Sequence, residues 1–171
     1  MKKILFLLLC IPMVCLGQEI STDKIEKIKN TIKTEYDSLE KEVFIESKII
    51  PGKISINRFI RPYYQGNTYV NFTINSNDNY FGLDKKGGVI TFETGEELKL
   101  HETLNTTITD NGYNFSISIK IIGQKLWEWF STRKIKKYRL YKYEVILSKE
   151  QSEDFLIAFK IIKDMKHSVV P

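Results

Sequence analysis

The feature that most constrains the fold is a series of short segments between residues 43 and 122 in which apolar and polar side chains alternate. The clearest is "YNFSISIKII", whose apolar positions are Phe115, Ile117, Ile119 and Ile121. A period of two is typical of a β-strand with one covered and one solvated face. The segment therefore predicts a sheet that is covered on one side.

Turn signals separate these segments. "VFIESKII" ends at Pro51-Gly52, "GVITFE" is followed by Thr94-Gly95, and Asp110-Asn111-Gly112 precedes the last segment. Short links that contain glycine are typical of β-hairpins, and hairpins pair their strands antiparallel. We therefore predict a mostly antiparallel sheet of about six to seven strands over residues 43–147.

An N-terminal helix is predicted over residues 23–41. Asp23 followed by Glu26 suits a capping box. The apolar residues then recur at steps of three and four, as on one face of a helix, at positions Ile25, Ile28, Ile32, Tyr36 and Leu39. We interpret this stripe as a face that docks on the sheet.

A second long helix is predicted over residues 149–166. Ser148 and Gln151 have capping-box spacing, and the apolar face that follows contains Phe155, Ala158, Phe159 and Ile162. Residues 124–130 predict a short helix as well. The expected fold class is α+β, in a single domain over residues 18–171 with both terminal helices packed on the sheet.

Residues 1–17 have the layout of a secretory signal peptide. Lys2 and Lys3 precede an apolar run from Ile4 to Leu16, and the predicted cleavage lies between Gly17 and Gln18. The run is too short to cross a hydrocarbon core of ~30 Å as a helix. We therefore expect an exported protein, periplasmic or extracellular, with no transmembrane anchor after cleavage.

Cleavage would change the chemistry of the chain. Cys10 and Cys15 both lie in the removed segment, so the mature chain would hold no disulfide and no cysteine-ligated zinc. The chain has 26 basic and 21 acidic residues, and the loss of Lys2 and Lys3 would leave 24 basic residues and a formal charge of +3. So mild an excess disfavours nucleic acid as a partner.

Two stretches, "KKGGVITFETGEELKL" and "IKKYRLYKYEVILSKEQSEDFLIAFKIIKDM", together resemble a loose group of small exported proteins of Gram-negative bacteria. The resemblance is one of pattern and covers roughly residues 43–166. It implies a small α+β domain, and it transfers no activity to any residue. Members of the group often end their last helix with a cysteine, whereas this chain has His167 near that place.

One stretch, "KLWEWFSTRKIKKYRLYKYEV", combines basic and aromatic side chains and has two interpretations. It can be a short helix that runs into a central strand, with lysine and arginine stems lying along apolar surface. It can also bind an anionic glycan or lipopolysaccharide through charge and stacking. The candidate binding residues are Trp127, Arg133, Lys134, Lys136, Lys137 and Arg139.

Catalytic patterns are weak in this sequence. His101 and His167 have no metal-ligand spacing, and we expect no metal and no cofactor. Glycosidases use two carboxylates ~5–9.5 Å apart. Four acidic residues flank one predicted hairpin and could supply such a pair, namely Glu93, Glu96, Glu97 and Glu102.

The leading hypothesis is a non-catalytic exported module of the bacterial envelope that binds a protein or a surface polymer. The first alternative is an anion-binding surface, for lipopolysaccharide or an acidic glycan, made by the basic and aromatic residues 127–142. A further alternative is a hydrolase that uses the carboxylates near residues 93–102.

Overall fold

A computed structural model describes residues 21–61, 66–77, 86–110 and 112–165, which form an α+β fold with three helices and two antiparallel sheets. The predicted fold class and the antiparallel pairing are confirmed. The proposed signal peptide, with Cys10, Cys15, Gly17 and Gln18, lies outside the described residues, as does His167.

The strands divide into two sheets rather than the single sheet that we predicted. The first has six strands, in the spatial order β1 (Ile32–Asp37), β2 (Glu42–Ile50), β3 (Ile54–Ile60), β4 (Asn67–Ser76), β8 (Gly112–Lys120) and β7 (Asn105–Thr109). The second has four, in the order β10 (Tyr143–Ile146), β9 (Ile135–Leu140), β5 (Lys86–Phe92) and β6 (Glu97–Thr103). Periodicity predicts strands, but it does not say which strands pair.

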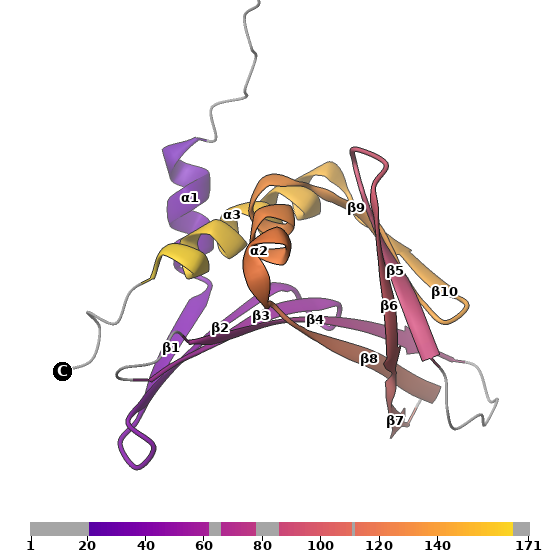
Figure 1. Cartoon of the computed structure of the whole chain (residues 1–171), viewed down its shortest axis with the longest axis horizontal. Helices are drawn as coiled ribbons and strands as arrows, with labels where there is room; N and C mark the ends of the chain where they lie inside the picture. The colour runs from indigo at the N-terminus through magenta and orange to yellow at the C-terminus, as the bar shows by residue number, and fades with distance from the viewer. Residues whose placement is uncertain (1–20, 62–65, 78–85, 111, 166–171) are drawn as a thin grey trace, which may run out of the picture.

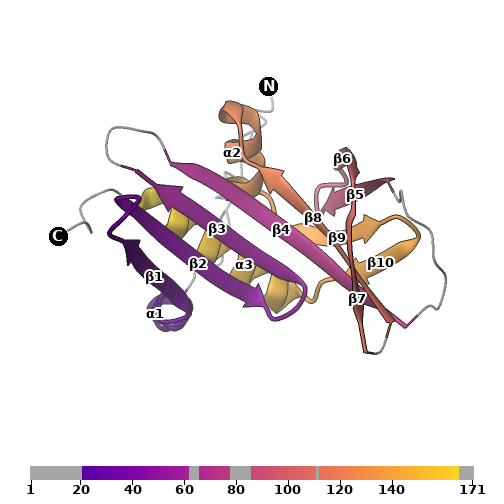
Figure 2. The same ribbon diagram turned by 90° about the horizontal axis from the view of Figure 1, so that it is seen from below.

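The helices and the four-stranded sheet all lie on one face of the six-stranded sheet (Figure 1, Figure 2). No helix or strand of the described residues covers the opposite face, which we call the open face. The helices are α1 (Thr22–Lys29), α2 (Gly123–Thr132) and α3 (Lys149–Asp164). The core fills the space between these layers, where Phe72 and Phe115 of the sheet and Phe159 of α3 are fully buried. The sheet arches, so that its open face is concave (Figure 1).

The N-terminal helix is shorter than predicted. It ends at Lys29, and residues 32–37 form the edge strand β1 against β2. Ile32 and Tyr36 fit a helical step of four and also share one parity of a strand, so their spacing does not distinguish the two structures. The cap differs too, because the side chain of Ser21, not Asp23, accepts the hydrogen bond from the N–H of Lys24.

Residues 135–147 form a hairpin rather than one strand. Tyr141 adopts a positive φ of 54° at the turn, and β10 returns beside β9. Leu140 pairs with Tyr143, and Tyr138 with Val145, so these side chains face the core together. Apolar residues of both parities therefore belong to one face, because the turn reverses the chain between them. β9 is central, as predicted, between β10 and β5.

The other two predicted helices are confirmed. α2 contains the predicted short helix, and α3 begins at the predicted capping box, where Ser148 and Gln151 exchange hydrogen bonds of 3.1 and 3.0 Å. The expected apolar face of α3 is buried. Within the described ranges, no helix has the length and apolar character needed to cross a membrane.

Candidate functional site

The basic and aromatic residues of the predicted binding segment make contacts with several different elements. Trp127 is half-buried on α2, with its ring 5.5 Å from that of Phe159. The guanidinium of Arg133 lies 4.6 Å from the ring of Trp129 and forms an ion pair of 2.9 Å with Glu96.

The remaining cations of the segment either form ion pairs with acids on other elements or are exposed. Lys134 forms an ion pair of 2.8 Å with Glu153 of α3, and Lys137 forms one of 2.9 Å with Glu144 of β10. Lys136 and Arg139 are exposed on β9. Three of the six predicted contact residues thus form ion pairs with acids of this chain, and Trp127 packs on Phe159. Their role in binding stays a prediction.

The acidic residues near the β5–β6 hairpin lie on the surface. Glu93, Glu96, Glu97 and Glu102 are all solvent-exposed, and Glu96 accepts a hydrogen bond of 2.9 Å from Thr94. His101 is exposed on β6. In the part of the chain that the structure describes, no group of three or more potential ligands lies close enough to hold a metal ion. These four residues therefore form no enclosed carboxylate pair that would support the hydrolase alternative.

A more coherent group of side chains lies on the open face of the six-stranded sheet. Alternate residues of β2, β3, β4 and β8 point to this face, because their neighbours in sequence fill the core. The pairing registers place them in rows across the strands. One row contains Phe44, Phe59 and Asn67, the next contains Asn57, Tyr69 and Lys120, and the third contains Ser55, Asn71 and Ser118.

Three aromatic rings are contiguous on this face. The ring centroids of Phe44 and Phe59 are 5.0 Å apart, and those of Phe59 and Tyr69 are 5.9 Å apart at nearly a right angle. All three side chains are half-buried, although no helix in the described part of the chain covers this face. The rings offer both faces and edges to a ligand lying across β2, β3 and β4.

Amide and hydroxyl groups lie beside the rings. Ser118 donates a hydrogen bond of 2.6 Å to the side-chain oxygen of Asn71, whose amide nitrogen donates one of 3.2 Å to Ser55. This chain fixes the orientation of the Asn71 amide. The side-chain oxygen of Asn57 is buried and has no hydrogen-bond partner among the described residues. Buried acceptors of this kind are rare and call for an explanation.

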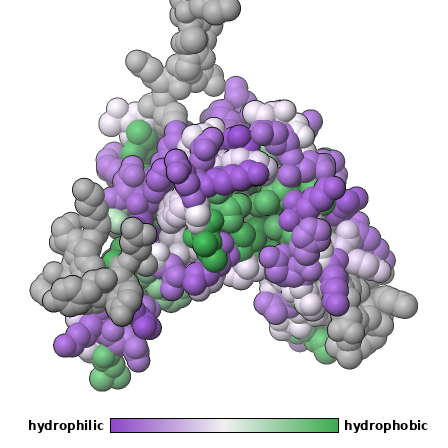
Figure 3. All heavy atoms as spheres, in the orientation of Figure 1, coloured by the Kyte–Doolittle hydropathy of each residue, from purple (hydrophilic) through white to green (hydrophobic). Residues whose placement is uncertain are grey.

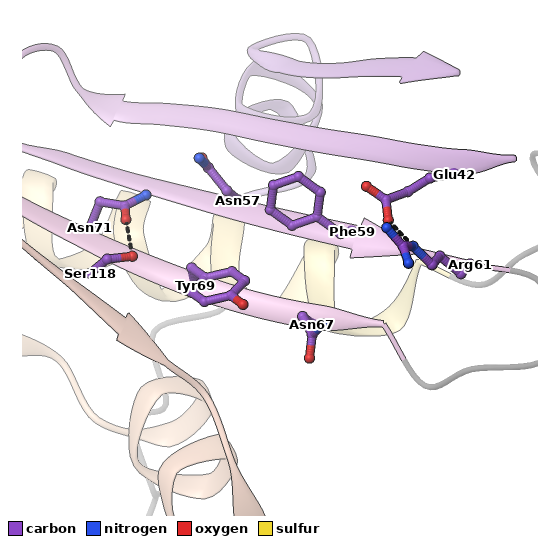
Figure 4. A pocket seen from close by; sticks show the side chains of 8 residues that line it. All are labelled: Glu42, Asn57, Phe59, Arg61, Asn67, Tyr69, Asn71 and Ser118. Carbon is purple, nitrogen blue, oxygen red and sulfur yellow. Dashed lines mark hydrogen bonds and ion pairs between the residues drawn. The ribbon is translucent and has the colours of Figure 1, made fainter. Parts of the chain in front are cut away.

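These groups line a recess of about 700 Å³ (Figure 4). The lining residues are Glu42, Asn57, Phe59, Arg61, Asn67, Tyr69, Asn71 and Ser118. Figure 3 shows the hollow below the arch of the sheet, between the two ends of the molecule. Its volume lies within the range of ~300–1,000 Å³ that is usual for small-molecule sites.

The recess has one charged pair. Arg61 donates to the carboxylate of Glu42, and this hydrogen bond raises the pKa of Arg61 above its ordinary value. The two charges offset one another, so the lining is nearly neutral. It combines flat apolar rings with groups that can both donate and accept hydrogen bonds. Such a surface suits an uncharged part of a ligand, with apolar faces and many hydroxyl groups.

The sequence analysis predicted no binding site on this face, although the sequence contains a signal for one. Phe44, Phe59 and Tyr69 each stand at the polar parity of a strand whose other parity is apolar. A large aromatic residue on the solvated side of three successive strands is informative, because exposed apolar groups gathered in a patch often mark binding sites.

Comparison with known proteins gives no further information on this site. No family model, no curated protein and no solved structure matches the chain.

Proposed function

We propose that this chain is a non-catalytic binding module, exported to the bacterial envelope, and that the open face of its six-stranded sheet holds a polysaccharide. Sugar rings have apolar C–H faces that pack on aromatic rings, and their hydroxyls both donate and accept hydrogen bonds. The recess supplies both kinds of partner side by side. Export rests on the N-terminal sequence pattern described above.

The observation that carries this proposal is that the strand register places the aromatic rings beside the asparagine side chains. Tyr69 lies directly opposite Asn57 in the pairing register, and Asn71 is two residues further along the same strand. A sugar ring stacked on Tyr69 would therefore have its hydroxyls within reach of both amides. Asn57 lines the recess, so a turn of its side chain would bring its partner-free oxygen to such a hydroxyl.

Other partners fit this face less well. Nucleic acids are bound mainly by cations that contact phosphates. The cation of this recess, Arg61, is already paired with Glu42. A peptide strand adds to the edge of a sheet, where backbone groups are unpaired, rather than to its face. Hydroxyl-rich polymers need neither phosphate contacts nor a free edge.

The test is a binding screen of neutral oligosaccharides, built on glucose, xylose and N-acetylglucosamine, followed by calorimetry on the best ligand. The Tyr69→Ala variant should weaken binding by about tenfold or more, because it removes the stacking surface, and tenfold corresponds to about 1.4 kcal/mol. Asn71→Ala should weaken binding as well, since it removes the central group of the amide network.

The matched control is Tyr36→Ala. Tyr36 is a tyrosine on β1 of the same sheet, but it lies opposite the buried Val43 and hence on the other face. This variant should bind like the unaltered protein. If Tyr36→Ala and Tyr69→Ala have equal effects, or if no saccharide binds, the proposal is wrong.

A further inference from the structure

A second recess, of about 620 Å³, adjoins the first one at the end of the sheet where β4 begins and β8 ends. Asn67 lines both recesses. The second recess differs in charge, since three cations line it together with one tryptophan. The residues that matter here are Arg58, Lys120, Trp127 and Lys163.

Arg58 is the best-fixed cation of this group. It extends from β3 to the helix face, where one of its terminal nitrogens donates to the backbone oxygens of Ile162 and Lys163 at the end of α3. Its guanidinium carbon lies 5.9 Å from the ring of Trp127. Its Nε is buried and has no hydrogen-bond partner among the described residues.

Arg58 contacts backbone oxygens but forms no ion pair with a carboxylate among the described residues. Burial lowers the pKa of Arg58, and Asp164 is the acid that opposes this effect. An arginine nevertheless stays protonated in a protein, so the recess holds a charge that is partly removed from water. A buried cation with incomplete pairing favours an anion nearby.

Lys120 and Lys163 add two exposed cations. Neither takes part in an ion pair among the residues that the structure describes. The start of α2 also lines the recess, and its N-cap residue Ile122 makes no side-chain cap hydrogen bond. The backbone N–H groups of that turn add donors beside the cations. The hydrogen bonds from Arg58 offset the partial negative charge at the end of α3.

The two recesses are within reach of a single ligand. Lys120 lies opposite Tyr69 in the pairing of β4 with β8, and both side chains belong to the open face. Side chains paired in this way have Cβ atoms about 4.5–5.5 Å apart. A sugar ring on Tyr69 would therefore bring a substituent of its own, or of the next ring, to the cations.

We infer that the ligand is an acidic saccharide whose carboxylate or phosphate lies among Arg58, Lys120 and Lys163 while its rings lie on the open face. The inference rests on the proposed function and specifies its ligand. The sequence analysis grouped Trp127 with the basic residues of its own segment. In the structure, Trp127 lines a recess together with cations of β3, β8 and α3.

The test compares saccharides that differ only in charge. Tetragalacturonate carries carboxylates, and its full methyl ester is the neutral counterpart. Maltotetraose with and without a terminal phosphate forms the second pair, and inorganic phosphate alone is the third arm. We expect the acidic member of at least one pair to bind about tenfold more tightly at low salt, with a preference that weakens as ionic strength rises. The two pairs distinguish carboxylate from phosphate.

Variants then assign the preference to the recess. The double variant Lys120→Gln, Lys163→Gln should lose the preference for the acidic ligand and keep its affinity for the neutral one. Lys99→Gln is the control, because Lys99 is an exposed lysine on β6 in the other sheet. It should behave like the unaltered protein.

The outcomes separate the two claims. If no saccharide binds, the proposed function itself fails. If acidic and neutral members bind equally, or if the double variant keeps the preference, only the inference about the acidic group is overturned. Inorganic phosphate that binds as tightly as the phosphorylated saccharide, with no effect of Tyr69→Ala on either, would also overturn it, since the sugar would then contribute nothing.

Discussion

Tyr138 joins the two sheets. It extends from β9, is fully buried, and packs its ring against that of Phe72 at 5.0 Å. Its hydroxyl donates to the backbone oxygen of Thr73 at 2.7 Å and lies 3.3 Å from that of Lys53. Burial raises the pKa of Tyr138 far above its ordinary value, so the hydroxyl stays protonated and remains a donor.

The first prediction concerns this hydroxyl. Tyr138→Phe keeps the ring and removes the donor, which leaves the part-buried backbone oxygen of Thr73 with one partner fewer. The free energy of unfolding should fall by about 1–3 kcal/mol. Urea denaturation followed by circular dichroism measures it. Tyr36→Phe, at an exposed tyrosine, should leave the midpoint unchanged, and equal midpoints for all three proteins would contradict this account.

At the scale of elements, Glu153 ties α3 to two other parts of the chain. Its carboxylate lies 2.8 Å from the ammonium of Lys134 and 3.1 Å from that of Lys24 on α1. Hydrogen bonds from Lys134 and then Lys24 lower the pKa of Glu153 from its ordinary 4.5 to about 2. The short helix α1 is thus held on α3 by charge as well as by Ile28, which is buried.

A pH dependence follows from this shift. Because the pKa of Glu153 is lower in the folded state, the pairing stabilises the fold fully above about pH 4.5 and loses its effect as the pH falls toward 2. The side chains reach solvent, so the contribution at pH 7 should be about 1 kcal/mol or less.

The measurement is urea denaturation of the unaltered protein and Glu153→Gln at several pH values. Their difference in unfolding free energy should be largest at pH 7 and shrink through the window from 4.5 to 2. Glu128→Gln, at an exposed glutamate of α2, serves as the control. A difference between unaltered protein and Glu153→Gln that does not change with pH would count against the ion pairs.

Elements whose signals are local could be predicted from the sequence. The capping box at Ser148 and the alternation around Phe115 each involve residues a few positions apart, and both are present in the structure. The end of α1 could not be predicted, because residues 32–37 satisfy both periods and the pairing with β2 decides between them. The turn at Tyr141 was missed for a related reason, since no glycine or proline marks it.

At the scale of the whole molecule, the arrangement of the sheets creates the candidate site. The four-stranded sheet and the helices cover one face of the six-stranded sheet, and no other described element covers the concave face. The lining residues of the recess run from Glu42 to Ser118 in the sequence, and only strand order and register bring them together. No local pattern contains that information, which is why the sequence pointed to the contiguous segment 127–142 instead.

That segment also shows why charge along a chain is a weak guide to a surface. Its cations alternate along β9 or turn toward acids on other elements, such as Glu96 and Glu153. The basic recess around Trp127 draws its cations from three other elements. A mildly basic net charge therefore arises from several small groups rather than from one patch.

The central claim is that a saccharide lies on the open face of the six-stranded sheet, and NMR chemical-shift mapping tests it most directly. The isotope-labelled protein would be titrated with the best saccharide from the screen. We predict that the amide shifts concentrate at Asn57, Tyr69, Asn71 and Ser118, including the side-chain amides of the two asparagines. Shifts confined to Lys137 and Arg139 on the outer side of β9, or saturable binding that leaves the open face unperturbed, would contradict the account.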